Sequence, residues 1–268
     1  MKLRVTLTLT LMLLGTFVWQ THTVLGQIVE DGLVSAWTFD AGDGRDSAGN
    51  NDCETEGAPR PDVGIIGDAL EFNGVADAFN CGDPADGSLD VGTHDYTITC
   101  WAQPYDTGVS ARVMDKKDDA DTGFMLEHNV LAGFQTYVSD GQGDVSRVIE
   151  PNGNQHYDDT WHHVAGVHDR NDVVRLYVDG VEILDGNHML DADAANENAD
   201  NDSPFYIARR PSGEYFAGLI DEMYLYNRAL TLDEVLQNMN ATVGPTAGTA
   251  VAPGAKLALT WGRVKASR

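Results

Sequence analysis

The sequence predicts an all-β protein with one short helix near its end. Three observations support this fold class. Apolar and aromatic residues recur in many short runs, and the 28 glycines suit tight turns between them. No stretch alternates strands with helices in the βαβ order of nucleotide-binding folds. About a dozen strands followed by a single helix favour a β-sandwich or jelly roll.

The expected strands follow one another at short intervals. They cover residues 33–39, 69–72, 78–81, 97–103, 123–126, 161–167, 173–178, 181–184 and 219–226. Asp179-Gly180 separates two of these runs. Asp-Gly is a strong hairpin signal, because a type I′ turn needs positive φ at both central residues.

The helix is predicted at residues 231–239. Thr231-Leu232-Asp233-Glu234 has the pattern of a capping box, in which the Thr hydroxyl and the Glu carboxylate each accept a free backbone N–H. Leu230 precedes the cap and can pack on Val235.

The charge balance excludes one class of partner. Seventeen basic residues face 42 acidic ones, for a net charge of −25. Binding to a nucleic-acid backbone requires clustered Lys and Arg. We therefore expect no nucleic-acid partner.

Residues 1–26 have the pattern of a secretory signal peptide. Lys2 and Arg4 precede an uncharged apolar run from Val5 to Val18, and Val24-Leu25-Gly26 supplies small residues for cleavage. The run is short for a membrane span. We expect a secreted or cell-surface protein with no transmembrane span after cleavage.

Export permits disulfides, and the chain has three cysteines, Cys53, Cys81 and Cys100. Three cysteines form at most one internal bridge, and three pairings are open. Cys100 lies in an alternating strand and suits a small buried apolar position. We prefer the pair Cys53 and Cys81.

The two ends flank one predicted domain at residues 27–240. Residues 241–268 begin with a Gly-, Pro-, Ala- and Thr-rich linker and continue as a basic tail. Such a tail is a candidate tether that docks an envelope or export component.

Several segments, taken in order, resemble the laminin-G-like, concanavalin A-like jelly-roll (LamG-like) domains of secreted bacterial proteins. The matching pieces are residues 32–40, 46–52, 69–74, 96–101, 161–165, 176–180 and 218–230. The resemblance implies a β-sandwich of two antiparallel sheets. It does not specify a ligand, because this fold carries lectins, glycosidases and adhesion modules.

The resemblance also implies a structural calcium ion where the first and last strands meet. Asp221 is the first candidate ligand and Asp40 the second, and Asn73 or the Gly74 carbonyl completes the set. Calcium prefers carboxylate and carbonyl oxygens.

The expected catalytic pattern of a glycosidase is absent. Such enzymes on this fold place two carboxylates at alternate positions of one strand, and we find no such pair, while a pair supplied by distant strands stays open. Glu54-Thr55-Glu56, Asp118-Asp119-Ala120-Asp121, Asp158-Asp159 and Asp191-Ala192-Asp193 all suit solvated loops.

The histidines also suit a framework role. His162 and His163 are neighbours in a strand and point to opposite faces, so they cannot share a metal ion without a bulge. We expect one of them packed and the other on the surface.

The leading functional prediction is a secreted, non-catalytic recognition module that binds an extracellular glycan or a protein surface. Tyr105, Tyr137, Tyr157 and Tyr215 are candidate sugar contacts, because they lie near loop boundaries. A polysaccharide-degrading enzyme and a purely structural surface protein are the alternatives.

Overall fold

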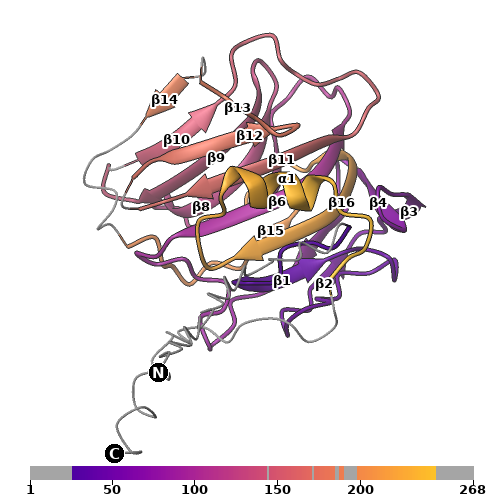
Figure 1. Cartoon of the computed structure of the whole chain (residues 1–268), viewed down its shortest axis with the longest axis horizontal. Coiled ribbons are helices and arrows are strands. Elements are labelled where there is room, and N and C mark those ends of the chain that lie inside the picture. The colour runs from indigo at the N-terminus through magenta and orange to yellow at the C-terminus, as the bar shows by residue number, and fades with distance from the viewer. Residues whose placement is uncertain (1–25, 144, 171, 185–186, 190–197, 246–268) are drawn as a thin grey trace, which may run out of the picture.

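Two antiparallel β-sheets pack face to face in the computed structural model (Figure 1). The structure describes residues 26–143, 145–170, 172–184, 187–189 and 198–245. Each sheet has eight strands, and one helix follows the last strand. The sandwich predicted from the sequence is confirmed.

The first sheet is organised around the long strand β16 (Ala217–Tyr226), which pairs with β6 (Tyr96–Pro104) along one edge. On its other edge, residues 217–220 pair with β4 (Asp68–Asn73) and residues 223–226 pair with β1 (Leu33–Trp37). The remaining strands are β3 (Arg60–Val63), β11 (His162–His168), β12 (Val174–Val178) and β13 (Val181–Glu182).

The second sheet contains most of the middle of the chain. Its strands, in spatial order, are β14 (Asn187–Met189), β10 (Val145–Ile149), β9 (Gly133–Asp140), β8 (Thr122–Asn129), β7 (Ala111–Lys117), β15 (Tyr206–Ile207), β5 (Ala78–Asn80) and β2 (Glu54–Glu56).

The main core lies between the two sheets. Side chains alternate along each strand, so Phe124 and Leu126 of β8 and Phe134 and Val138 of β9 point inward. Trp37 of β1 is fully buried, and its ring lies 5.2 Å from that of Phe205.

The outer side of the first sheet is also covered. Helix α1 (Leu232–Met239) packs Val235 into a second apolar cluster that includes Tyr224 and Tyr226 of β16. Asn238 accepts a hydrogen bond from the Val29 amide at 2.8 Å and donates one to the Tyr226 hydroxyl at 2.9 Å. The first sheet therefore has no free face at these residues.

Two local predictions are confirmed. Thr231 and Glu234 form the expected capping box. Asp179 and Gly180 turn β12 into β13 with φ values of 51° and 74°, the positive values that a type I′ turn requires.

Cys53 and Cys81 form a disulfide, and Cys100 is a buried free thiol in β6. Residues 54–56, expected in a loop, form strand β2 beside β5. The disulfide lies next to both strands, and their pairing satisfies backbone groups that a loop would leave to water.

The two ends of the described chain are joined. Thr242 and Val243, expected in the linker, donate backbone hydrogen bonds to the Gly26 carbonyl at 2.8 and 2.9 Å. The signal sequence before Gly26, the tail from residue 246 and Asp191-Ala192-Asp193 lie outside the described residues. In the described ranges no helix has the length and apolar character to cross a bilayer.

Candidate functional site

The second sheet leaves its outer face uncovered by the helix, and this face carries a dense set of polar and aromatic side chains. We use "outer face" for the side of this sheet that points away from the main core. Directly opposed residues form a row across five strands, Arg147, Tyr137, Met125, Asp115 and Tyr206. A parallel row contains Gln135, Glu127 and Arg112.

Arg112 holds the centre of the outer face together. Its guanidinium pairs with Asp115 of the same strand at 3.0 Å, with Glu127 of β8, and with Glu214 at 3.2 Å. Arg112, Asp115 and Glu127 are all buried. Burial raises the pKa of Asp115 to about 6, although Arg112 and Lys117 act in the opposite direction.

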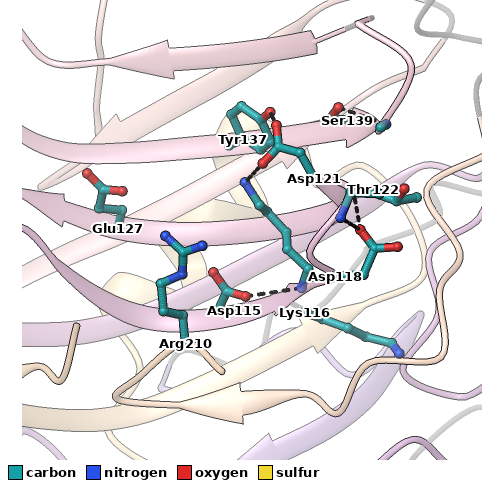
Figure 2. Close-up of polar contacts among 12 residues, drawn as sticks. Asp115, Lys116, Asp118, Asp121, Thr122, Glu127, Tyr137, Ser139 and Arg210 are labelled. Atoms are coloured by element: carbon teal, nitrogen blue, oxygen red, sulfur yellow. Dashed lines mark hydrogen bonds and ion pairs between the residues drawn. The ribbon is translucent and has the colours of Figure 1, made fainter. Parts of the chain in front are cut away.

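A second group connects the turn between β7 and β8 to β9. Asp121 accepts hydrogen bonds from the Lys117 ammonium and the Tyr137 hydroxyl, and Figure 2 shows Asp121 directly beside Tyr137. Burial alone would raise the pKa of Asp121, but these two bonds outweigh it and the pKa is lowered. Burial and the bond to Asp121 raise the pKa of Tyr137 to about 12. Asp121 lies in an exposed turn, as expected, and its carboxylate also takes part in this network.

A third group lies toward β15. The Arg209 guanidinium lies 4.1 Å from the Tyr206 ring centre and 5.7 Å from that of Tyr215. It also pairs with Glu56 of β2 at 3.0 Å. Cations thus cover one side of the tyrosine rings on this face, as Lys117 also does for Tyr137 at 4.2 Å.

Of the four tyrosines singled out in the sequence, only Tyr137 and Tyr215 belong to the outer face. Tyr105 follows β6 of the first sheet, where its hydroxyl lies 3.4 Å from Glu71. Tyr157 packs against His128. Sequence reasoning missed Arg112, Asp115 and Glu127. Strand β7, which carries Arg112 and Asp115, was not predicted, and Glu127 lies just beyond the strand expected at residues 123–126.

Asp115 and Glu127 are two carboxylates on adjacent strands, and their arrangement bears on catalysis. Glycoside hydrolysis needs one carboxyl group that holds a proton and a second that is free to act as base or nucleophile. Here both carboxylates pair with the same Arg112, so their oxygens are occupied by a permanent cation. The arrangement is better suited to fixing the sheet surface than to proton transfer.

A separate polar site lies at a bulge in β16. The register of β16 against β6 shifts between Asp221 and Tyr224, and Glu222 has a φ of 50°. Asp221 accepts backbone hydrogen bonds from Ile65 at 2.7 Å and Ile66 at 3.2 Å. Asp221 lies where β16 changes its edge partner from β4 to β1. The loop before β4 therefore holds this residue through its backbone N–H groups.

The carboxylates at the bulge are buried and incompletely paired. Asp221 Oδ1 and both Glu222 carboxylate oxygens have no hydrogen-bond partner. Burial raises the pKa of Asp221 to about 7 and that of Glu222 to about 9, and the charge of Asp40 adds to both shifts. Asp40 and Asp221 are thus close together, as expected, and Glu222 joins them.

Asn73 does not join this group. It lies at the other end of β4, opposite Ala217, and its amide oxygen accepts the backbone N–H groups of residues 75–77. Four positions of β16 separate Ala217 from Asp221, which is about 13 Å at the rise of a strand. Gly74 also lies against Ala217, so its carbonyl is at the same distant end.

His162 lies at the start of β11, between two carboxylates. Its Nδ1 is 2.8 Å from Asp179 and its Nε2 is 3.1 Å from Asp158. His163 is buried and packs its ring against Trp101. The expectation that one of the pair is a surface residue is wrong, because the hairpin turn and the loop before β11 cover His162.

Comparisons with known proteins agree with this geometry. A family model described as the concanavalin A-like lectin/glucanases superfamily matches residues 77–236, which is more than half of the chain. The chain belongs to this superfamily. No curated protein sequence matches it.

Solved structures of this superfamily fold include several binding domains. The binding domain of Paraclostridial Mosquitocidal Protein 1 has a TM-score of 0.61 at 18% identity, over 78% of this chain and 52% of that one. Domain 4 of the extracellular arabinanase AbnA from Geobacillus stearothermophilus, solved with arabinotriose, has a TM-score of 0.53 at 20% identity, over 77% and 97%. The receptor-binding domain of a botulinum neurotoxin C/D mosaic has a TM-score of 0.57 at 11% identity, over 79% and 51%.

The chain spans about half the length of the toxin domains that it matches. At these identities the likeness concerns the fold.

Replacing Arg112 with Gln tests the role of the central guanidinium. The variant leaves Asp115 and Glu127 buried without their cation, so we expect it to lose about 3–5 kcal/mol of unfolding free energy. Urea unfolding measures the loss. Arg45→Gln, which removes an exposed pair with Asp43, should change stability by less than about 1 kcal/mol. Equal stability of the Arg112 variant and the native protein would contradict the assignment.

The His162 contacts predict a pH-dependent contribution to stability. Hydrogen bonds to Asp179 raise the pKa of His162 above its ordinary value of 6.5, and Asp158 adds to the shift. Because the folded-state pKa is raised, this stabilisation is complete below pH 6.5 and is lost as the pH rises through the folded-state pKa.

His162→Gln should therefore lower the unfolding free energy more at pH 6 than at pH 9. Denaturant titrations at the two pH values measure the difference. His94→Gln, at an exposed histidine, controls for the loss of an imidazole. A loss of unfolding free energy in His162→Gln that is larger at pH 9 than at pH 6 would contradict the assignment.

Proposed function

We propose that this protein is a secreted, non-catalytic recognition module that binds an extracellular glycan through the outer face of its second sheet. The observation that carries the proposal is the composition of this face. The Tyr215 ring and Arg147 are partly exposed on this face, and Tyr137, Tyr206 and Gln135 are buried members of its cross-strand rows. Glycan sites combine such aromatic surface with a few fixed polar groups.

The fixed geometry of these groups supports binding. Cross-strand ion pairs of Arg112, Lys117 and Arg209 hold the surrounding side chains in place before a ligand arrives. A site that is already ordered loses less side-chain entropy on binding. The arabinotriose complex of the AbnA domain is a precedent for sugar binding on this fold.

Secretion is part of the same proposal. Residues 1–26 carry the pattern of a signal peptide. A disulfide between Cys53 and Cys81 suits an oxidising compartment. The basic tail after residue 245 remains a candidate tether to an envelope or export component.

We further propose that a calcium ion binds at the β16 bulge as a structural ligand. Three buried carboxylate oxygens of Asp221 and Glu222 lack a partner there, with Asp40 nearby. Calcium is a hard cation that prefers such oxygens. In the described part of the chain no three acidic, His or Cys side chains form a metal cage alone, so backbone carbonyls or water would complete the shell.

Binding is tested with the protein lacking residues 1–26 on a panel of oligosaccharides. Tyr215→Ala removes a partly exposed ring of the outer face, and we expect affinity for the bound glycan to fall roughly tenfold, about 1.4 kcal/mol. Tyr105→Ala, on the other sheet, is the matched control and should bind normally. Unchanged binding by Tyr215→Ala, or release of reducing ends from the glycan, would contradict the proposal.

The calcium site is tested by thermal unfolding. At a calcium concentration 100 times Kd, binding to the folded state alone adds about 2.7 kcal/mol, so Tm should rise by several degrees and fall again with EDTA. Glu222→Gln should lose this response yet be at least as stable as the native protein in EDTA, because it replaces a buried carboxyl group that has no partner with a neutral amide of similar size. A Tm that changes with neither calcium nor EDTA would exclude a bound calcium ion.

A further inference from the structure

The outer face differs in charge from the rest of the molecule. The chain as a whole has a net charge of −25, yet five of the eleven Lys and Arg residues in the described ranges lie on this one face. They are Arg112, Lys117, Arg147, Arg209 and Arg210.

Four of these five cations are neutralised by carboxylates of the protein itself. Arg112 and Lys117 are paired as described above, Arg209 pairs with Glu56, and Arg210 pairs with Glu214 at 3.1 Å. These four cations therefore have their charge partners within the sheet and its loops.

Arg147 is the exception. Its side chain forms no hydrogen bond or ion pair within the described part of the chain, and its Nε is buried without a partner. The residue is only partly exposed. A polar group removed from water without a hydrogen bond destabilises the free protein, and a ligand that accepts its N–H groups would remove this penalty.

The position of Arg147 places this free cation inside the proposed binding surface. It lies on β10 directly opposite Tyr137, whose neighbours on the outer face of β9 are Gln135 and Ser139. Arg147 also acts on the titration of the Tyr137 hydroxyl, so the two groups are close in space. Tyr137, Gln135 and Ser139 are buried, so a ligand would reach this end of the outer face at the partly exposed Arg147.

We propose that the glycan bound by the outer face carries an anionic group, a uronic-acid carboxylate or a sulfate ester, and that Arg147 binds this group. A guanidinium presents N–H donors in a planar fork that matches the oxygens of a carboxylate or sulfate. This inference rests on the proposed glycan-binding function and names the chemical class of the ligand.

The charge of the remaining protein limits what this ligand can be. Among the described residues only Arg147 of the cations on this face lacks a carboxylate partner, and the protein is strongly acidic. The net negative charge of the protein repels a densely charged anionic polymer, so the guanidinium of Arg147 is better matched to a glycan whose acidic groups are spaced apart.

The test uses two matched pairs of oligosaccharides with the protein lacking residues 1–26. One pair is a galacturonate tetrasaccharide and its methyl ester, and the other is a galactan tetrasaccharide with and without a sulfate ester. Calorimetric titration should show at least tenfold tighter binding of an anionic form than of its neutral partner. The pair that shows the preference distinguishes carboxylate from sulfate.

Variants then assign the preference to Arg147. Arg147→Gln should abolish it, Arg147→Lys should retain part of it, and Arg45→Gln, which removes an exposed cation elsewhere, should leave it intact. Thermal unfolding establishes whether each variant is folded. If Arg147→Gln does not fold, a reduced preference in Arg147→Lys tests the assignment instead.

The outcomes separate this inference from the function on which it rests. Equal binding of charged and neutral partners, or an unchanged preference in Arg147→Gln, would overturn the anionic ligand while leaving glycan binding intact. Failure to bind any member of a broad glycan panel would overturn both.

Discussion

Strand β16 imposes the constraint on which the rest of the structure depends. All ten of its residues are buried, and it pairs with β6 on one edge and with β4 and then β1 on the other. Strand β1, the first described strand, therefore pairs with β16, the last one. The change of partner coincides with a bulge that buries two acidic residues, Asp221 and Glu222.

Buried carboxylates must be protonated or meet a cation. The loop of residues 64–68 satisfies one oxygen of Asp221 through the Ile65 and Ile66 amides. This loop approaches closely, since a Cβ at Gly64 would lie 2.5 Å from Asp221 Oδ2. The other oxygens of the pair have no such donor, so this part of the fold requires either protonated carboxyl groups or a cation at the bulge.

The sequence predicted elements whose signals are local. Asp179-Gly180 and Thr231 to Glu234 behave as expected because a turn type and a helix cap depend on a few neighbouring residues. The sandwich itself followed from the spacing of apolar runs.

The binding face was harder to predict from sequence. Strand β7 has a bulge between Arg112 and Met114 that interrupts its alternation, and the outward positions of β9 are polar. Asp121 reaches Tyr137 only because the sheet brings a turn beside a strand 16 residues away. Glu222 follows Asp221 directly, and an ordinary strand would point the two side chains to opposite faces.

The arrangement of charge on the outer face favours recognition over catalysis. A catalytic acid has to give up a proton to the substrate, and a base has to be free to accept one. Arg112 pairs with both Asp115 and Glu127, and their other oxygens accept the Lys117 amide and the Asn129 side chain, so both oxygens of each carboxylate already have partners within the protein. The same pairing fixes the shape of the surface without a ligand. Because the other charges of this surface are paired within the protein, the proposed recognition function depends on the one side chain, Arg147, that has no such partner in the described chain.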